Sequence, residues 1–244
     1  MYGLIGNPLG HSFSALFFNK KFKDECIDET YQLFPIPDIS DVVNLINDNP
    51  DLKGFNVTIP YKQQIIPYLS ILSDEAKEIG AVNVVKIDRT NDVITLSGHN
   101  SDAIGFRNTL LPFLSPDMKR ALVLGTGGAS KAVIYVLQSL GIKVTTVSRT
   151  RSANSISYRD ITPEIIRDNL IIVNTTPLGM WPDIENAPDI PYEFLTSAHL
   201  CYDVVYNPEI TAFMRKSRQY GATVKNGLDM LHEQAVAAWE IWQS

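Results

Sequence analysis

Strand-like and helix-like segments alternate along all 244 residues, and this alternation predicts an α/β protein with mainly parallel sheets. Two further observations divide the chain. Before residue 102, the segments that follow strands are rich in Ser, Asn, Thr and Lys, whereas a glycine-rich turn at 125–128 opens a new series of strands and helices. We therefore expect an N-terminal α/β domain at 1–102, completed by a C-terminal helix at 228–244. A Rossmann-type, doubly wound domain should occupy 103–227.

In the first domain, the hydrophobic period decides between strand and helix. The segment 53–59 shows the pattern of a half-buried strand, because Phe55, Val57 and Ile59 alternate with polar residues, and Pro60 should end it. By the same criteria the expected strands are 2–6, 30–35, 53–59, 82–88 and 93–98, and the expected helices are 13–25, 39–48, 61–69 and 74–79.

The second domain should begin with a helix at about 102–114 and a buried strand at 120–124, directly before the glycine turn. The expected strands are 120–124, 142–147, 169–174, 200–204 and 222–225, and the expected helices are 102–114, 129–140, 209–219 and 228–242. The last helix carries apolar residues at helical spacing, and we expect it to pack back on the first domain.

The composition is that of a soluble globular protein, with 45% hydrophobic and 20% charged residues. A net charge of -6 argues against nucleic acid as a partner. Cys26 and Cys201 lie in segments that look buried and lack CxxC spacing, so we expect reduced thiols. The four histidines, which are His11, His99, His199 and His232, show no metal-ligand spacing. With no signal peptide and no apolar run near the roughly 20 residues of a membrane span, we expect a cytoplasmic protein.

The segment "ALVLGTGGASKAVIYVLQSLG" at 121–141 is a strand, a glycine turn and a helix. Its glycines allow a backbone to approach a pyrophosphate, and the helix N-terminus offers free N–H groups. Ser130 stands where the third glycine of GxGxxG is usual; the alternative is a tight turn without a ligand. The residues expected to contact a dinucleotide here are Gly125, Thr126, Gly127, Gly128, Ala129 and Ser130.

The end of the next strand should decide which dinucleotide binds. An acidic residue there would favour a ribose 2′-hydroxyl, but this chain has Ser148, Arg149, Thr150 and Arg151. Two guanidiniums and two hydroxyls suit a 2′-phosphate, so we expect NADP(H) rather than NAD. The alternative is a pair of arginines that only solvate a loop.

Seven polar motifs follow one another along the chain. They are GNPLGHSFS (6–14), NVTIPYK (56–62), GAVNVV (80–85), GHNSDAIGF (98–106), VNTTPLGMWP (173–182), CYDVVYNP (201–208) and NGLDMLHEQA (226–235). In this order and spacing they resemble shikimate dehydrogenase over essentially the whole chain. The resemblance implies an NADP-dependent enzyme that interconverts 3-dehydroshikimate and shikimate in aromatic amino acid biosynthesis. It also implies that the first domain binds the substrate and the second binds NADP.

The resemblance assigns residues by motif position. It implies that Lys62 and Asp102 form the catalytic acid–base pair, and that Ser12 and Ser14 hold the substrate carboxylate. The residues implied to contact ring hydroxyls or line the same pocket are Thr58, Asn83, Asp102, Tyr206 and Gln234. The residues implied to lie near the nicotinamide are Val204, Gly227 and Met230.

Each of these residues also has a purely structural alternative. Ser12 and Ser14 can be a helix N-cap and its neighbour, Asp102 can cap a helix, and Lys62 can be a surface lysine. The chain departs from the family pattern at Ala15, Phe18, Ser148 and Asp229.

Three other functions compete with this interpretation. The first is a quinate or dual quinate/shikimate dehydrogenase, for which NAD and an acidic residue after the second strand are usual; the SRTR segment argues against it. The second is a non-catalytic sensor of shikimate-like ligands, against which the Lys62–Asp102 pair argues. The third is a related two-domain NADP enzyme that acts on another carbonyl, but the paired serines and the polar residues Asn83, Asp102 and Gln234 favour a cyclic hydroxy acid. We expect a monomer or homodimer with a small-molecule substrate and with neither a nucleic-acid nor a membrane partner.

Overall fold

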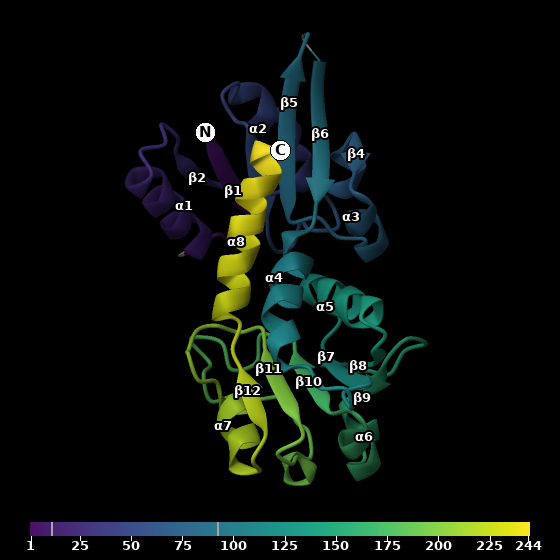
Figure 1. The fold of residues 1–244 in the computed structure, drawn as a ribbon. Coiled ribbons are helices and arrows are strands. Elements are labelled where there is room, and N and C mark those ends of the chain that lie inside the picture. The colour runs from purple at the N-terminus through teal and green to yellow at the C-terminus, as the bar shows by residue number, and fades with distance from the viewer. Residues whose placement is uncertain (11, 92) are drawn as a thin grey trace. The chain divides into compact units, whose positions relative to one another are not determined.

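The computed structural model describes residues 1–10, 12–91 and 93–244, so His11 lies outside the described residues. The chain divides into two compact units (Figure 1). Unit 1 comprises Met1–Ser101 and Gln234–Ser244, and unit 2 comprises Asp102–Glu233. Both units are α/β, and most strand pairs in them are parallel, which confirms the predicted fold class.

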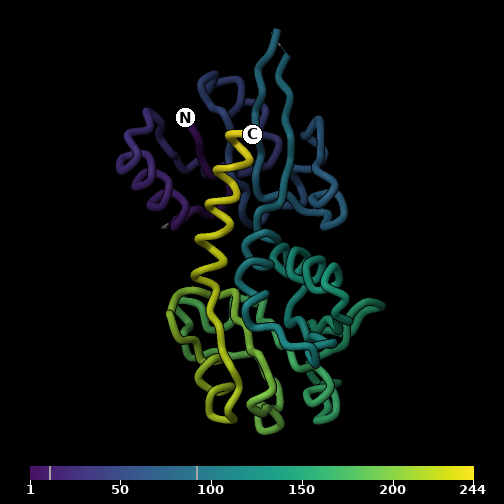
Figure 2. Tube along the Cα trace, in the orientation of Figure 1, coloured from purple at the N-terminus to yellow at the C-terminus, as the bar shows by residue number. Residues whose placement is uncertain are grey.

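Unit 1 is built on a six-stranded sheet with the order β2-β1-β3-β5-β6-β4. The chain passes from β1 through α1 to β2, which pairs with β1 in parallel (Figure 2). The strands are β1 (Tyr2–Gly6), β2 (Tyr31–Pro35), β3 (Gly54–Val57), β4 (Ile71–Leu72), β5 (Val84–Thr90) and β6 (Val93–His99). The helices are α1 (Phe13–Asp24), η1 (Ile39–Asp41), α2 (Val42–Asp48), η2 (Ile66–Tyr68) and α3 (Asp74–Ile79). The antiparallel pairs are those of β5 with β3 and with β6.

Strand β3 is buried on both faces, so the predicted half-buried strand at 53–59 was wrong. It lies between β1 and β5. Phe55 and Val57 pack in one hydrophobic cluster, while Asn56, 5% exposed, bonds to Tyr31 of a second cluster. The strand ends at Val57, and Ile59 is 74% exposed. A central strand covered on both faces needs no solvent-facing side, and the alternation in the sequence therefore misled.

The predicted helix at 61–69 was also wrong, because this segment is a series of turns with only the short η2 at its end. The carbonyl of Lys62 accepts a hydrogen bond from the Val82 amide at 2.7 Å, while the Ile66 amide bonds to Gln63 at 3.3 Å. In an α-helix, the Ile66 amide would bond to the Lys62 carbonyl. Here the Val82 amide occupies that carbonyl, and the Ile66 amide bonds to Gln63 instead. Pro67 supplies no N–H further along, which also stops a helix.

The C-terminal helix α8 (Leu228–Gln243) contributes its residues from Gln234 onward to unit 1. Trp242 stacks on Tyr2 with ring centroids 4.6 Å apart, and its indole N–H donates to the Val85 carbonyl at 3.0 Å. Gly54 of β3 lies so close that a Cβ there would come within 2.5 Å of this indole nitrogen. The helix end is thus fitted against the sheet by a contact that only glycine allows.

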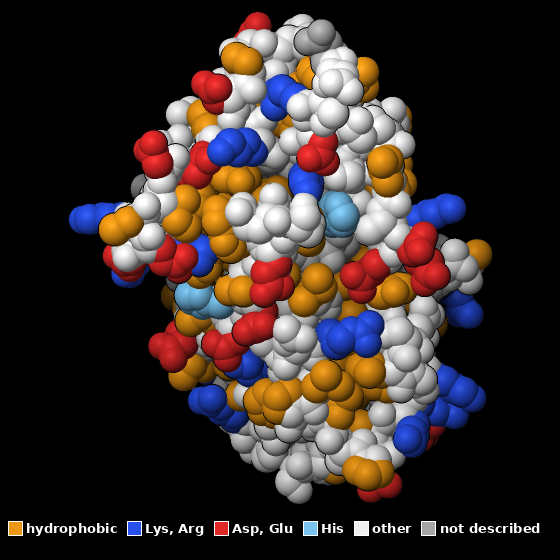
Figure 3. All heavy atoms as spheres, turned by 45° about the horizontal axis from the view of Figure 1, so that its top comes forward, with side chains coloured by type: hydrophobic (Ala, Val, Ile, Leu, Met, Phe, Trp, Pro, Cys, Tyr) orange, Lys and Arg blue, Asp and Glu red, His pale blue; other side chains and the backbone are white. Residues whose placement is uncertain are grey.

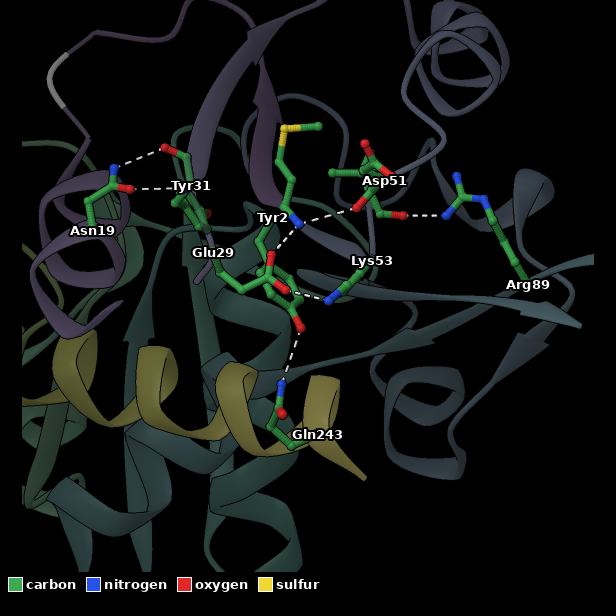
Figure 4. Close-up of polar contacts among 10 residues, drawn as sticks. Tyr2, Asn19, Glu29, Tyr31, Asp51, Lys53, Arg89 and Gln243 are labelled. Carbon is green, nitrogen blue, oxygen red and sulfur yellow. Dashed lines mark hydrogen bonds and ion pairs between the residues drawn. The ribbon is translucent and has the colours of Figure 1, made fainter. Parts of the chain in front are cut away.

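The amino ends of β1, β2 and β3, together with the carboxyl-terminal half of β5, form a hollow lined by charged groups (Figure 4). Glu29 accepts hydrogen bonds from the Met1 amine and from Lys53, and Arg89 donates to three backbone carbonyls that include Leu52. Beside this hollow, the side-chain amide of Asn19 exchanges two 2.9 Å hydrogen bonds with the backbone of Tyr31 (Figure 4). These groups bond to one another and fix the ends of the strands, so we do not place the functional site here.

Unit 2 is built on a parallel six-stranded sheet with the order β12-β11-β10-β7-β8-β9. The strands are β7 (Arg120–Leu124), β8 (Lys143–Ser148), β9 (Ile156–Ser157), β10 (Ile171–Asn174), β11 (Leu200–Asp203) and β12 (Thr223–Lys225). The helices are α4 (Ser101–Leu110), which begins in unit 1, η3 (Leu111–Phe113), α5 (Gly128–Ser139), η4 (Tyr158–Asp160), α6 (Pro163–Asp168), η5 (Tyr192–Phe194) and α7 (Ala212–Gln219). Helix α6 was not predicted from the sequence, although Thr162 caps it and Pro163 opens it.

The surface carries charges of both signs (Figure 3), and one of the two cysteines lies on it. On the face drawn in Figure 3, Lys and Arg side chains are interspersed with Asp and Glu. Cys26 is exposed, so the prediction that it is buried was wrong, whereas Cys201 is buried; both are free thiols. Cys26 follows the end of α1 with a positive φ of 54°, which places it in a surface turn. No helix among the described residues is long and apolar enough to cross a membrane.

Candidate active site

The carboxyl ends of β1 and β3 bring two predicted groups of polar residues to the same edge of the sheet. The two strands are parallel neighbours with Ile5 opposite Val57, and the Thr58 amide donates to the Ile5 carbonyl at 3.0 Å. A Cβ on Gly6 would come within 2.5 Å of the Thr58 side chain. Thr58 therefore lies directly beside the start of the segment that carries Ser12 and Ser14.

Ser12 and Ser14 have different surroundings. Ser12 is the N-cap of α1, and its hydroxyl accepts a 3.4 Å hydrogen bond from the Ala15 amide. The structural alternative is thus realised for Ser12, although its O–H remains a donor. The Ser14 side chain hydrogen bonds to Tyr31, whose pKa is raised well above its ordinary value by burial. The Tyr31 phenol therefore stays neutral.

A buried network of neutral polar groups joins Asn83 and Gln234, two residues that lie 151 positions apart in the sequence. Asn83 Nδ2 lies 3.0 Å from Ser101 Oγ and 3.5 Å from Gln234 Oε1, and Asn83 Oδ1 accepts the Ser101 amide at 2.7 Å. Ser101 Oγ lies 3.4 Å from Gln234 Oε1. The structure thus brings these two residues together, with Ser101 between them, while their contact with substrate stays a prediction.

The same network continues through residues that were not predicted as site residues. Tyr31 donates its hydroxyl to Asn56 Oδ1 at 2.7 Å, and Asn56 Nδ2 donates to the Asn83 carbonyl at 3.2 Å. Asn56 is the first residue of the motif NVTIPYK but was given no role, and Tyr31 had no sequence signal beyond that of a core aromatic residue. Since buried polar groups in proteins are almost always hydrogen-bonded, these contacts fix Asn83 in one orientation.

Lys62 and Asp102 lie in differently built segments. Lys62 is half-buried in the turn after β3, where its carbonyl is held by the Val82 amide. Asp102 is 7% exposed in the first turn of α4, and it directly follows Ser101, whose amide Asn83 holds. A carboxylate suits this position because the helix N-terminus is partially positive. Lys62 belongs to unit 1 and Asp102 to unit 2, and their pairing stays a prediction.

The glycine turn after β7 has the shape that a dinucleotide site requires. Gly125 has a φ of +112°, and a Cβ there would come within 2.7 Å of Thr175 Oγ1, so glycine is required by the protein itself. A Cβ on Gly127 would meet nothing within 4 Å. Gly127 is the N-cap of the 12-residue helix α5 and supplies no capping side chain, so the first N–H groups of α5 have no side-chain acceptor there. Its backbone is open to an anion, and the residues fit a pyrophosphate.

Ser130 does more than replace a glycine. It is buried, and its hydroxyl donates to the Gly127 carbonyl at 2.6 Å. This bond connects the first turn of α5 to its own N-cap residue. Thr126 is exposed, while Gly128 and Ala129 lie at the start of α5.

The basic segment after β8 is held by serines, and its arginines are exposed. Ser148 hydrogen bonds to the Thr150 carbonyl and to Ser155 Oγ, the latter at 2.8 Å. Arg151 forms a 3.7 Å ion pair with Asp160, whose pKa is lowered mainly by a hydrogen bond from the Ser157 amide. Among the carboxylates that the structure describes, none pairs with Arg149. This guanidinium is the better placed of the two to bind an added phosphate.

Two of the three residues predicted near a nicotinamide touch each other. A Cβ on Gly227 would clash with the Val204 carbonyl oxygen, and the Gly227 amide donates to the Val205 carbonyl at 3.2 Å. Met230 is buried at 7% exposure in the first turns of α8, and Tyr206 is 37% exposed in the loop after β11. Asp229, at which the chain departs from the family pattern, forms a surface ion pair with Lys225.

A parallel sheet with an open glycine turn and a nearby arginine, combined with a unit rich in neutral hydrogen-bonding groups, defines a nicotinamide-dependent oxidoreductase of small polar substrates. Comparison with known proteins specifies the family. The model of the shikimate dehydrogenase substrate binding domain matches residues 4–85.

Two kinds of relatives match nearly the full chain. A shikimate dehydrogenase (NADP(+)) of Clostridium beijerinckii is 39% identical over 259 residues, which covers 99% of this chain and 91% of that protein. The structure of shikimate 5-dehydrogenase from Thermus thermophilus in complex with NADP(H) and shikimate is 29% identical, with a TM-score of 0.85 and coverage of 99% and 92%. The chain therefore belongs to the shikimate dehydrogenase family.

A third similarity shows how widely this fold is used. Ligand-free 5-ketofructose reductase of Gluconobacter sp. strain CHM43 is 26% identical, with a TM-score of 0.81 and coverage of 99% and 91%. Since one fold serves different carbonyl substrates, the substrate must be argued from the residues of this chain.

Proposed function

We propose that this chain catalyses the reversible, NADPH-dependent reduction of 3-dehydroshikimate to shikimate, a step of aromatic amino acid biosynthesis. The observation that carries the proposal is the buried network that fixes Asn83, Ser101 and Gln234 in unit 1. A polyhydroxylated cyclic acid needs several short hydrogen-bonding side chains. A site of this kind rejects analogues that lack a hydroxyl, because its own buried groups would then be unpaired.

The roles of the substrate residues follow from their chemistry. In this proposal Ser12 and Ser14 donate hydroxyl hydrogens to the substrate carboxylate, and Tyr206 lines the pocket. The residues that bind ring hydroxyls are Thr58, Asn83, Asp102 and Gln234. The substrate domain is 1–102 with the helix at 228–244, and the NADP-binding domain is 103–227.

Lys62 and Asp102 handle the proton. When bound, NADPH would supply the hydride that the substrate carbon needs. The carbonyl oxygen gains negative charge as the ketone is reduced, and the Lys62 ammonium donates a proton to it. Asp102 accepts a hydrogen bond from the same hydroxyl and orients the lysine. In the reverse direction, neutral Lys62 takes the proton from the shikimate hydroxyl.

The cofactor would be held at three places. The turn at 125–130 binds the pyrophosphate, and Ser148, Arg149, Thr150 and Arg151 bind the adenosine 2′-phosphate. Val204, Gly227 and Met230 contact the nicotinamide. The exposed Arg149, which pairs with none of the described carboxylates, supports NADP over NAD. Hydrogen bonds to charged groups contribute about 1.5–3 kcal/mol, and a tenfold preference needs about 1.4 kcal/mol.

The test is the rate of absorbance change at the nicotinamide band, with shikimate or quinate as substrate and NADP or NAD as cofactor. We expect shikimate with NADP to give the highest kcat/KM. A higher value for quinate with NAD would show a quinate dehydrogenase instead. Turnover of 5-ketofructose but not of 3-dehydroshikimate would show that the chain is a reductase of another carbonyl substrate. Shikimate binding without turnover in any combination would show a ligand sensor.

We further propose that the enzyme works in the cytoplasm as a monomer or homodimer on small molecules. The two free thiols support a reducing compartment. Light scattering at several concentrations decides between the two oligomeric states.

A further inference from the structure

A fully buried carboxylate, Asp203, ends strand β11 in unit 2 and has no place in the proposed chemistry. It accepts three hydrogen bonds. Asn174 Nδ2 donates to Oδ1 at 2.9 Å, the Val205 amide donates to Oδ1 at 3.0 Å, and Thr211 Oγ1 donates to Oδ2 at 2.6 Å. All three donors are neutral, and in the part of the chain that the structure describes no cation pairs with this carboxylate.

These bonds join three segments at the carboxyl edge of the sheet. Asn174 ends β10, and its Oδ1 accepts from the Thr176 amide at 3.0 Å and from the Thr176 hydroxyl at 2.6 Å. Thr211 is the N-cap of α7 and accepts the Met214 amide at 3.3 Å. Asp203 thus links the loop after β10 to the loop after β11 and to the beginning of α7.

The residue after Asp203 is Val204, and its backbone is fixed on both sides. The Val204 amide donates to the Asn174 carbonyl at 3.0 Å, and the next amide, of Val205, bonds to Asp203 itself. Gly227 then packs on the Val204 carbonyl so closely that no side chain fits. The Val204–Gly227 contact is therefore held through Asn174, which bonds to both Val204 and Asp203, and through the bond from the Val205 amide to Asp203.

We propose that Asp203, Asn174 and Thr211 form a positioning network that fixes the Val204–Gly227 surface against the nicotinamide ring. This inference rests on the proposed function, which places the nicotinamide at that surface. None of the three touches the reacting atoms in this account; they act through the backbone at 204–205.

Two physical points favour positioning over packing alone. Burying a carboxylate without a cation is costly, and an apolar residue would fill a simple core position at lower cost. Burial raises the pKa of Asp203 to about 6, which is the signature of that cost. Small displacements at a reacting centre reduce rates strongly, because transfer requires close alignment of donor and acceptor.

The test compares Thr211→Val with the wild type. Valine keeps the shape of threonine and removes the hydroxyl that bonds Asp203. We expect kcat to fall about tenfold, while the KM values for shikimate and NADP change less than about threefold. In the reverse direction, the primary isotope effect on kcat for reduction of 3-dehydroshikimate with deuterated NADPH should rise, because a misplaced ring makes hydride transfer more rate-limiting. Circular dichroism and thermal melting establish that the variant is folded.

Three further variants separate positioning from general destabilisation. Thr211→Ser restores the hydroxyl and should recover most of the lost turnover. Ser217→Ala is the matched control, because Ser217 is a buried hydroxyl on the same helix that donates locally to the Phe213 carbonyl at 2.9 Å. It should lower the melting temperature without changing kcat or the isotope effect. Asp203→Asn keeps the side-chain shape and alters the bond to Thr211, and it decides the matter if Thr211→Val does not fold.

The outcomes distinguish this inference from the function on which it rests. A wild-type protein without NADP-linked turnover of shikimate would overturn both. An active wild type combined with unchanged kcat and isotope effect in folded Thr211→Val and Asp203→Asn variants would overturn the positioning network alone. A fall in kcat in Ser217→Ala equal to that in Thr211→Val would also overturn it.

Discussion

At the residue scale, the two buried polar centres differ in their electrostatics. Asn83 in unit 1 hydrogen bonds to the neutral groups of Ser101 and Gln234. Asp203 in unit 2 is a buried carboxylate with neutral donors, and burial raises its pKa to about 6. Its titratable neighbours Tyr192 and Cys201 are buried with raised pKa values, so neither ionises below pH 7. Of these three groups, only Asp203 should therefore change its charge below pH 7.

This difference predicts how stability depends on pH. The pKa of Asp203 is higher in the folded chain than the value of about 4 for an unfolded aspartate. Folded protein therefore binds the proton more tightly, and the contribution of Asp203 to stability falls as the pH rises from about 4 to about 6. The side chain of asparagine does not titrate, so its contribution to stability does not change across this pH range. Relative to wild type, Asp203→Asn should gain about 3 kcal/mol in free energy of unfolding across this window.

Urea unfolding of both proteins at about pH 4.5 and about pH 7 measures this shift. The larger part of it should lie between these two values. A difference between variant and wild type that is the same at both pH values would contradict the buried, proton-retaining carboxylate.

At the element scale, the end of β8 shows what a sequence can and cannot reveal. The SRTR segment predicted an anion site from residue types alone. The ion pair between Arg151 and Asp160 was not predictable, because it depends on η4, an element that the sequence analysis missed. The elements that were missed or wrong are short or determined by tertiary contacts. Tyr61–Leu69 is one, since a distant amide takes the Lys62 carbonyl. Long segments with a clear period, such as α5 and α8, were predicted within one or two residues.

The two arginines should contribute unequally to cofactor choice. Arg149→Ala should raise the KM for NADPH about tenfold or more and leave NADH use almost unchanged, because it removes a group that only the 2′-phosphate needs. Arg151→Ala should have a smaller effect, since Arg151 already pairs with Asp160. Arg120→Ala, which removes an exposed arginine at the other end of the sheet, is the control. Steady-state kinetics with both cofactors measure the effects, and an equal loss with NADPH and NADH would exclude the assignment.

At the scale of the whole molecule, the fold and the order of the motifs could be predicted from the sequence. The predicted polar residues Asn83 and Gln234 meet in space because α8 returns to unit 1, a contact between residues 151 positions apart. Asn56 and Asp203 stand in motifs seen in the sequence, but their roles, like that of Tyr31, could not be predicted because they depend on burial and on partners from other strands. A polar residue in a strand does not reveal from sequence alone whether it faces solvent or a network.

The central claim is that Lys62 transfers the proton when a ketone of the shikimate ring is reduced with NADPH. The measurement is steady-state kinetics of Lys62→Ala with shikimate and NADP, together with shikimate binding by calorimetry. Lys86→Ala serves as the control, because Lys86 is a half-buried lysine in the same unit. We expect Lys62→Ala to lower kcat by about 10²–10⁴ and to leave the Kd for shikimate within a few-fold of wild type, whereas Lys86→Ala should change neither. A Lys62→Ala protein with wild-type kcat would contradict this claim.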